Sequence, residues 1–171
     1  MSANDQHGQL SHVAPDGTAR MVDVSAKPDT HRMARATGSI RMSDAAFDAI
    51  VRNAVAKGDV LGVARVAGIM AAKRTSELIP LCHPLPLHDV EVRLSPDETI
   101  PGVRVEVVAR TFGKTGVEME ALTGASVALL TVYDMAKALD RGMVISDISL
   151  AAKVGGEGGE YARLDGTPVA P

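Results

Sequence analysis

A long, mostly apolar stretch covers residues 113–139, GKTGVEMEALTGASVALLTVYDMAKAL. Small and apolar side chains fill its middle, whereas Glu118 and Glu120 stand near its start and Asp134 and Lys137 near its end. A helix that is apolar on all sides is typical of a buried element. The pattern predicts a turn followed by a long helix that is buried over most of its length.

Two further helical patterns come earlier in the chain. Ser43 is placed to cap a helix over 44–56, because its hydroxyl can accept a hydrogen bond from a free backbone N–H. The residues KGD at 57–59 interrupt that helix, and Asp59 can cap a second helix over 59–79. The first half of this second helix has few polar positions, which is typical of a helix buried between subunits.

Alternating apolar and polar positions predict the strands. Residues 89–95 and 102–111 flank the turn PDETIPG and predict a hairpin, and 36–42 and 143–154 predict two more strands. Three prolines hold 78–88 in a non-helical connection. The order β-α-α-β-β-α-β predicts an α+β two-layer sandwich, with helices on one face of a mainly antiparallel sheet.

The length of 171 residues is enough for one domain with a sizeable core. Aromatic residues make up 2% of the chain, so this core must be built from Ala, Val, Leu, Ile and Met. The polar residues 1–20 predict a flexible arm, and GGEGG begins a flexible, glycine-rich tail over 155–171. We expect residues 21–154 to form a single α+β domain that carries the catalytic site.

Composition also excludes several classes of function. A net charge of −3 argues against a surface that coats nucleic acid. One cysteine excludes an internal disulfide and a zinc site with several thiolates in one chain. The sequence contains no apolar run of about 18 residues and no apolar core of a secretory signal near its start. We therefore expect a cytoplasmic protein without nucleic-acid or membrane partners.

A phosphate-binding loop is the first candidate site. GKT at 113–115 precedes a predicted helix, but the P-loop pattern needs a glycine where Val108 stands. A free helix N-terminus can still hold an anion, although Glu118 and Glu120 would compete there. The pattern therefore disfavours a P-loop.

The charged residues of the long helix have two interpretations. Acidic residues in a first turn commonly complement the helix dipole, and Glu118 and Glu120, two residues apart, point to nearly opposite sides. Asp134 and Lys137, three residues apart, can meet on one face. Such a pair is either a surface ion pair worth under about 1 kcal/mol or a partly buried pair tuned for proton transfer. Lys57, between two helices, gives no signal in isolation.

Cys82, His83 and His88 lie in the proline-rich connection. Together they raise the possibility of zinc, although no fourth ligand stands out. His83 is equally suited to act as a general acid or base, or to cap a turn as a structural residue.

Residues 120 and 134 lie about 21 Å apart along one helix. A small substrate cannot touch both ends. If both ends act in catalysis, the site must be completed by other elements or by a second subunit, and the apolar helix over 59–79 favours an oligomer.

Three segments resemble the signature segments of the cyclic pyranopterin monophosphate synthase family: 57–87, 113–139 and MVDVSAK at 21–27. The resemblance covers about residues 20–160, and LCHPL, GVEMEALT and YDM-x-K are its most distinctive motifs. It implies a ferredoxin-like α+β subunit, assembled as a hexamer of three dimers with active sites at dimer interfaces. It also implies a lyase that converts 3′,8-cyclo-7,8-dihydro-GTP to cyclic pyranopterin monophosphate and releases pyrophosphate in molybdenum cofactor biosynthesis, with no metal or other cofactor.

The resemblance assigns roles to individual residues. Lys57 and Lys137 would transfer protons, with Asp134 orienting Lys137 and His83 acting beside them. The residues that would bind substrate are Leu81, Cys82, His83, Glu118, Met119, Glu120, Arg32 and Lys153. The acidic pair suits the N–H edge derived from guanine, and the basic residues suit the triphosphate.

Two positions depart from the family pattern. Glu157 stands in GGEGG where a basic residue is expected, which puts in doubt a phosphate role for the tail. Gly124 stands where alanine is common and should cost up to about 1 kcal/mol unless close packing requires it. Two other functions remain open: a non-catalytic nucleotide-binding oligomer and a zinc hydrolase using Cys82, His83 and His88.

Overall fold

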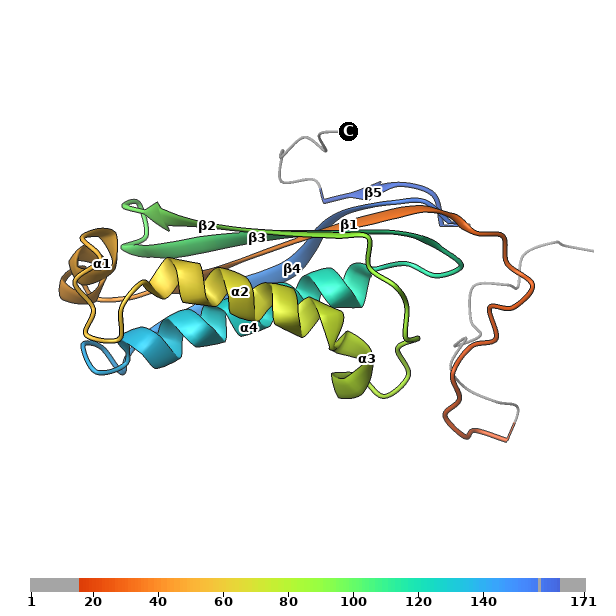
Figure 1. Ribbon diagram of the computed structural model, residues 1–171, viewed down its shortest axis with the longest axis horizontal. Helices are drawn as coiled ribbons and strands as arrows, with labels where there is room; N and C mark the ends of the chain where they lie inside the picture. Colours follow the sequence, from red (N-terminus) through yellow and green to blue (C-terminus); the bar gives the residue numbers. More distant parts are fainter. Residues whose placement is uncertain (1–15, 157, 164–171) are drawn as a thin grey trace, which may run out of the picture.

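The computed structural model describes residues 16–156 and 158–163, which form a sheet with helices packed against one face (Figure 1). The elements in chain order are β1 (Thr30–Arg41), α1 (Asp44–Val51), α2 (Val60–Lys73), α3 (Thr75–Leu78), β2 (Asp89–Asp97), β3 (Gly102–Gly113), α4 (Glu118–Ala136), β4 (Val144–Val154) and β5 (Tyr161–Ala162). The strand order is β2-β3-β1-β4-β5, and every neighbouring pair is antiparallel. The predicted ferredoxin-like α+β sandwich is confirmed.

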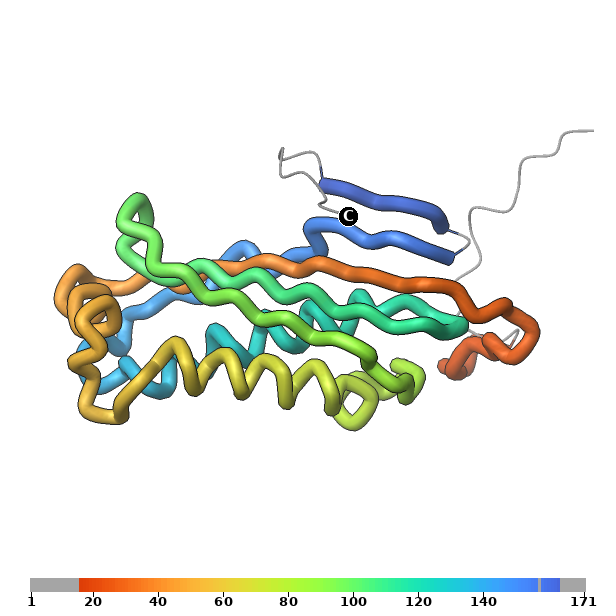
Figure 2. The backbone as a smooth tube through the Cα atoms, turned by 45° about the horizontal axis from the view of Figure 1, so that its top comes forward, coloured from red at the N-terminus to blue at the C-terminus, as the bar shows by residue number. Residues whose placement is uncertain are grey.

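The helices α2 and α4 lie side by side under the sheet, while α1 and α3 lie at its two ends (Figures 1 and 2). The core is built from small and branched side chains that alternate along the central strands. Ala36 of β1 stands opposite Val107 of β3, and Ile40 stands opposite Val103; all four are fully buried. Alternation of this kind places every second side chain on the helix-covered face.

The helices are shorter than the sequence predicts. The helix predicted over 44–56 ends at Val51, because Asn53 adopts a left-handed φ of 52° that asparagine tolerates. The helix predicted over 59–79 is divided at Arg74 into α2 and α3. There the Thr75 hydroxyl donates to the carbonyls of Ala71 and Ala72 and satisfies the end of α2.

Glycine is required where α2 and α4 cross. A Cβ placed on Gly124 would lie 3.2 Å from the Gly68 carbonyl oxygen and 3.2 Å from Val107 Cγ1. A Cβ on Gly68 would lie 3.0 Å from the Gly124 carbonyl oxygen. Close packing against α2 and β3 therefore explains a glycine in the middle of α4.

We expect Gly124→Val to lower the free energy of unfolding by about 2 kcal/mol, because a branched side chain would force α2 away from α4. Chemical denaturation monitored by circular dichroism measures this change. A variant as stable as the native protein would show that the two helices do not need this close approach.

The residues after β4 turn back over the sheet edge. Gly155 and Gly156 adopt φ values of 99° and 83°, and a side chain at either position would collide with His31 or Arg32. The chain then adds β5, in which Tyr161 pairs with Lys153 and Ala162 with Ala152. This strand lies within the predicted tail, whereas Glu157 lies outside the described residues. The flexible arm and tail stay predictions.

Candidate active site

Asp134 lies between two lysines at the C-terminal end of α4. Lys57, in the loop before α2, donates to Asp134 Oδ2 at 2.8 Å and to the Asp134 carbonyl oxygen at 2.8 Å. Lys137 donates to Asp134 Oδ1 at 2.6 Å. The structure thus brings together three of the four residues predicted to be catalytic.

These three side chains are about half exposed in the single chain, Asp134 at 57% and Lys137 at 51%. Hydrogen bonds from Lys137 and then Lys57 lower the pKa of Asp134 from 3.8 to about 2. Asp134 is therefore an ionised acceptor at neutral pH that holds two ammonium groups close together. Such an arrangement can orient a proton donor toward a neighbouring molecule.

Because the pKa of Asp134 is depressed, its ion pairs stabilise the folded chain above about pH 4, and this contribution is lost as the pH falls through about 2. We expect Lys57→Met to raise the pKa of Asp134 toward 3.8, since one hydrogen-bonded cation is removed. Carbon-13 NMR titration of the Asp134 carboxyl measures the change. An unchanged midpoint would exclude Lys57 as a partner of Asp134.

A second group of predicted residues lies at the opposite, N-terminal end of α4. The Cys82 thiol donates to Glu120 Oε1 at 3.4 Å. Glu120 is only 3% exposed, and among the described residues its Oε2 has no hydrogen-bond partner. A buried acceptor without a partner is costly, so Oε2 retains acceptor capacity that the described part of the chain does not use.

The pKa values at this end describe an apolar, acidic environment. Burial raises the pKa of the Glu120 carboxyl. Burial and the nearby Glu120 raise the pKa of Cys82 to about 11. Cys82 is therefore a neutral thiol at neutral pH, which makes it a hydrogen-bond donor and a poor nucleophile or metal ligand.

The charged residues around this pair have partners of their own. Glu118 Oε1 lies 3.2 Å from Lys153 Nζ, so the two predicted glutamates do point to different neighbours. Arg32 Nε donates to the Gly113 carbonyl oxygen, and its Nη2 donates to the Lys114 carbonyl oxygen, each at 3.2 Å. Arg32 therefore fixes the loop that leads into α4.

The remaining predicted residues lie in or beside the loop after α3. His83 Nε2 lies 2.7 Å from the Val22 carbonyl oxygen, and Leu81 is half-buried in the same loop. Met119, 37% exposed, stands between the two glutamates. Residue patterns gave no signal for the contact with Val22, because a backbone carbonyl has no sequence signature.

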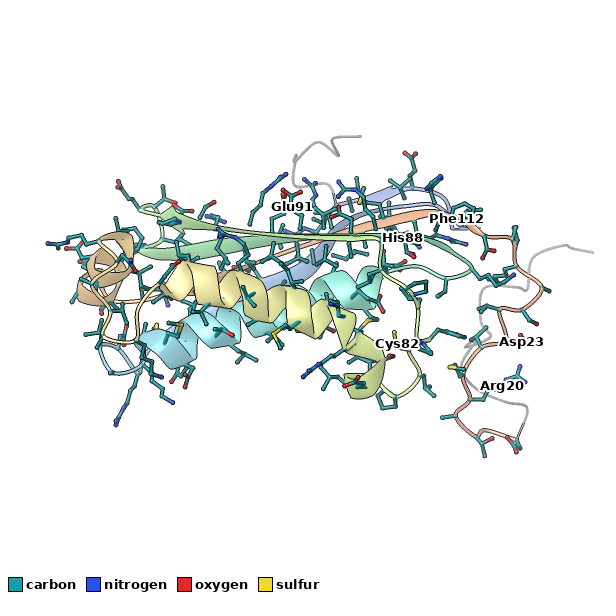
Figure 3. All side chains as sticks on the ribbon, viewed as in Figure 1. Arg20, Asp23, Cys82, His88, Glu91 and Phe112 are labelled. Carbon is teal, nitrogen blue, oxygen red and sulfur yellow. The ribbon has the colours of Figure 1, made fainter. Side chains whose placement is uncertain are left out.

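The side chains do not support the zinc alternative. His88 Nδ1 lies 3.3 Å from Thr111 Oγ1 on β3, whereas Cys82 faces Glu120. In the described part of the chain, no three His, Cys, Asp or Glu side chains are grouped so that they could hold a metal ion. Figure 3 also shows Cys82 in the loop after α3 and His88 at the start of β2.

The two groups are not brought together within one chain. The helix α4 has 19 residues and separates them, and residues 120 and 134 lie about 21 Å apart along it. Three acid–base side chains thus lie at one end of the molecule, and a buried carboxylate with a neutral thiol lies at the other.

Grouped lysine, aspartate and glutamate side chains on an α+β sandwich indicate the class of enzymes that act by acid–base catalysis. A family model described as the MoaC family matches residues 21–156, and the chain belongs to this family. Cyclic pyranopterin monophosphate synthases from Brucella ovis and Brucella melitensis biotype 2 are each 56% identical to it over 158 residues. The match covers 92% of this chain and 96% of each relative. A relative with the same name from Brucella suis biovar 1 is 55% identical.

These matches confirm the resemblance to the synthase family and the prediction of an enzyme, a lyase of molybdenum cofactor biosynthesis. Within the described residues, no helix combines the length and apolar character needed to cross a membrane.

Proposed function

We propose that this protein converts 3′,8-cyclo-7,8-dihydro-GTP to cyclic pyranopterin monophosphate with release of pyrophosphate. The observation that carries the proposal is the triad in which Asp134 holds Lys57 and Lys137 at 2.8 and 2.6 Å in a member of the MoaC family. Rebuilding a purine-derived ring requires several proton transfers. Two ammonium groups on one carboxylate provide donors next to each other.

Lys57 and Lys137 transfer protons, and Asp134 orients both lysines. His83 of the neighbouring subunit assists them in a site that the two subunits share. Glu120 accepts hydrogen bonds from the guanine-derived N–H edge, with its unpaired Oε2 as the acceptor. Cys82 holds the other oxygen of that carboxyl group.

The phosphates are assigned to Arg32 and Lys153. Lys153 is paired with Glu118 in the unliganded chain, and an ammonium group has three donors. It can therefore contact a phosphate oxygen while it retains this pair. Both cations would stabilise the pyrophosphate leaving group as the cyclic phosphate forms. Leu81 and Met119 line the same end of the site.

We propose a homo-oligomer whose active sites are shared between two subunits. Val63, Val66 and Met70 form an apolar stripe on the outer side of α2 and are 47%, 57% and 47% exposed. A stripe of this kind is suited to contact with another subunit. If the layer formed by α2 and α4 packs antiparallel against the same layer of a second subunit about a twofold axis, the Glu120 end of one subunit lies against the Asp134 end of its partner. The resemblance favours a hexamer of three dimers in the cytoplasm.

The proposal is tested by incubating the purified protein with 3′,8-cyclo-7,8-dihydro-GTP and measuring pyrophosphate and cyclic pyranopterin monophosphate. Equal amounts of the two products are expected. Binding without either product would favour the non-catalytic nucleotide-binding alternative. Stoichiometric zinc in the active protein, measured by elemental analysis, would favour the hydrolase.

A further inference from the structure

The segment that precedes β1 is fastened to the domain by side chains from two distant loops. Lys114 Nζ donates to the Ser25 carbonyl oxygen at 3.1 Å and to the Lys27 carbonyl oxygen at 2.6 Å. His83 Nε2 contacts the Val22 carbonyl oxygen of the same segment at 2.7 Å. In Figures 1 and 2 this segment runs beside the loop that follows α3.

The contact with Val22 determines the tautomer of His83. A carbonyl oxygen can only accept, so Nε2 must carry the hydrogen and donate it. A neutral imidazole that donates from Nε2 has its lone pair on Nδ1. The position of the segment therefore decides which ring nitrogen of His83 can act as a base or an acceptor.

The loop that carries Lys114 is itself held rigidly. Arg32 donates to the carbonyl oxygens of Gly113 and Lys114, which ties the loop to β1. Two of the three donors of the Lys114 ammonium group are then used on the segment. A continuous set of contacts thus leads from β1 through the loop at 113–114 to the segment at 22–27, and from there to His83.

We propose that Lys114 is a positioning residue that acts through the segment at 22–27 and holds His83 in the Nε2–H tautomer. The role of Lys114 in catalysis rests on the proposed function of His83, but its effect on the tautomer does not. The lysine of the GKT sequence then fastens the chain rather than binding a phosphate.

The test uses the full-length protein with nitrogen-15-labelled histidine, in which His83→Gln identifies the His83 signals among those of the five histidines. Long-range proton–nitrogen spectra of the native protein are expected to show a protonated Nε2 and an unprotonated Nδ1. Lys114→Met should give a mixture of tautomers. Lys114→Arg should keep the native form, because a guanidinium can donate to both carbonyls. Lys114→Gln provides a second neutral variant if methionine disturbs folding.

Kinetics separate positioning from substrate binding. Lys114→Met is expected to lower kcat about 10- to 100-fold, by analogy with the outer-shell partners that orient metal-bound histidines, with KM nearly unchanged and with rescue by Lys114→Arg. An unchanged tautomer would overturn the proposal. A large rise in KM with a native tautomer would assign Lys114 to the phosphates instead. If the native protein has no activity on the cyclised GTP derivative, the proposed function fails, but the tautomer result still decides the role of Lys114.

Discussion

Lys137→Ala is expected to abolish product formation, a loss of at least about 10³-fold in turnover, and Asp134→Ala is expected to do the same. Removal of Lys137 takes away the proposed proton donor, whereas removal of Asp134 releases Lys57 and Lys137 from the positions that their hydrogen bonds define. The three side chains are about half exposed, so we expect neither variant to unfold or to dissociate the oligomer. Turnover assays and size-exclusion chromatography measure the two properties separately.

The pair formed by Asp48 and Arg52 on α1 is a matched control. Its atoms lie 2.6 Å apart, and the side chains are 58% and 69% exposed, so it resembles the pair of Asp134 and Lys137 in distance and exposure. Asp48→Ala should leave turnover unchanged, because we assign this pair no role beyond a small contribution to stability. Normal turnover by purified Lys137→Ala or Asp134→Ala protein would contradict the assignment.

Most of the fold could be predicted from the sequence, because the patterns that define it are local. Alternation gave β2, β3 and β4 within about two residues at each end. The extent of β1 was underestimated: it begins at Thr30, where 36–42 was predicted. In its first half Arg32 shares a face with the buried Ala34 and Ala36, and the buried Arg35 points to the other face, so polar and apolar residues do not alternate there. The break at Arg74 has no glycine or proline to mark it.

The site could be predicted only in part. The spacing of Asp134 and Lys137 by three residues predicts that they meet, and they do. Lys57 reaches the same carboxylate from 77 residues away. The family resemblance placed Lys57 among the catalytic residues but predicted no contact with Asp134. Exposure does not separate the two open interpretations of the Asp134 and Lys137 pair, because both side chains are about half exposed in the single chain.

We propose that two subunits share each active site, because α4 separates the two halves of the site by about 21 Å in each chain. Glu120→Ala is expected to inactivate the protein, since it removes the buried carboxylate whose Oε2 is assigned to the substrate. The variants Glu120→Ala and Lys137→Ala then lack opposite halves of the site. In a twofold dimer, each active site takes one half from each chain.

The most direct measurement is the activity recovered when these two inactive variants are unfolded together in equal amounts and refolded. Each mixed dimer would contain one site with both substitutions and one intact site, so random pairing should restore about a quarter of the native activity. Each variant refolded alone should remain inactive, and native protein treated in the same way supplies the reference. Recovery of about a quarter is the result that sites shared across a subunit boundary predict. No recovery, with mixed dimers demonstrated by differently tagged chains, would show that each chain carries a complete site.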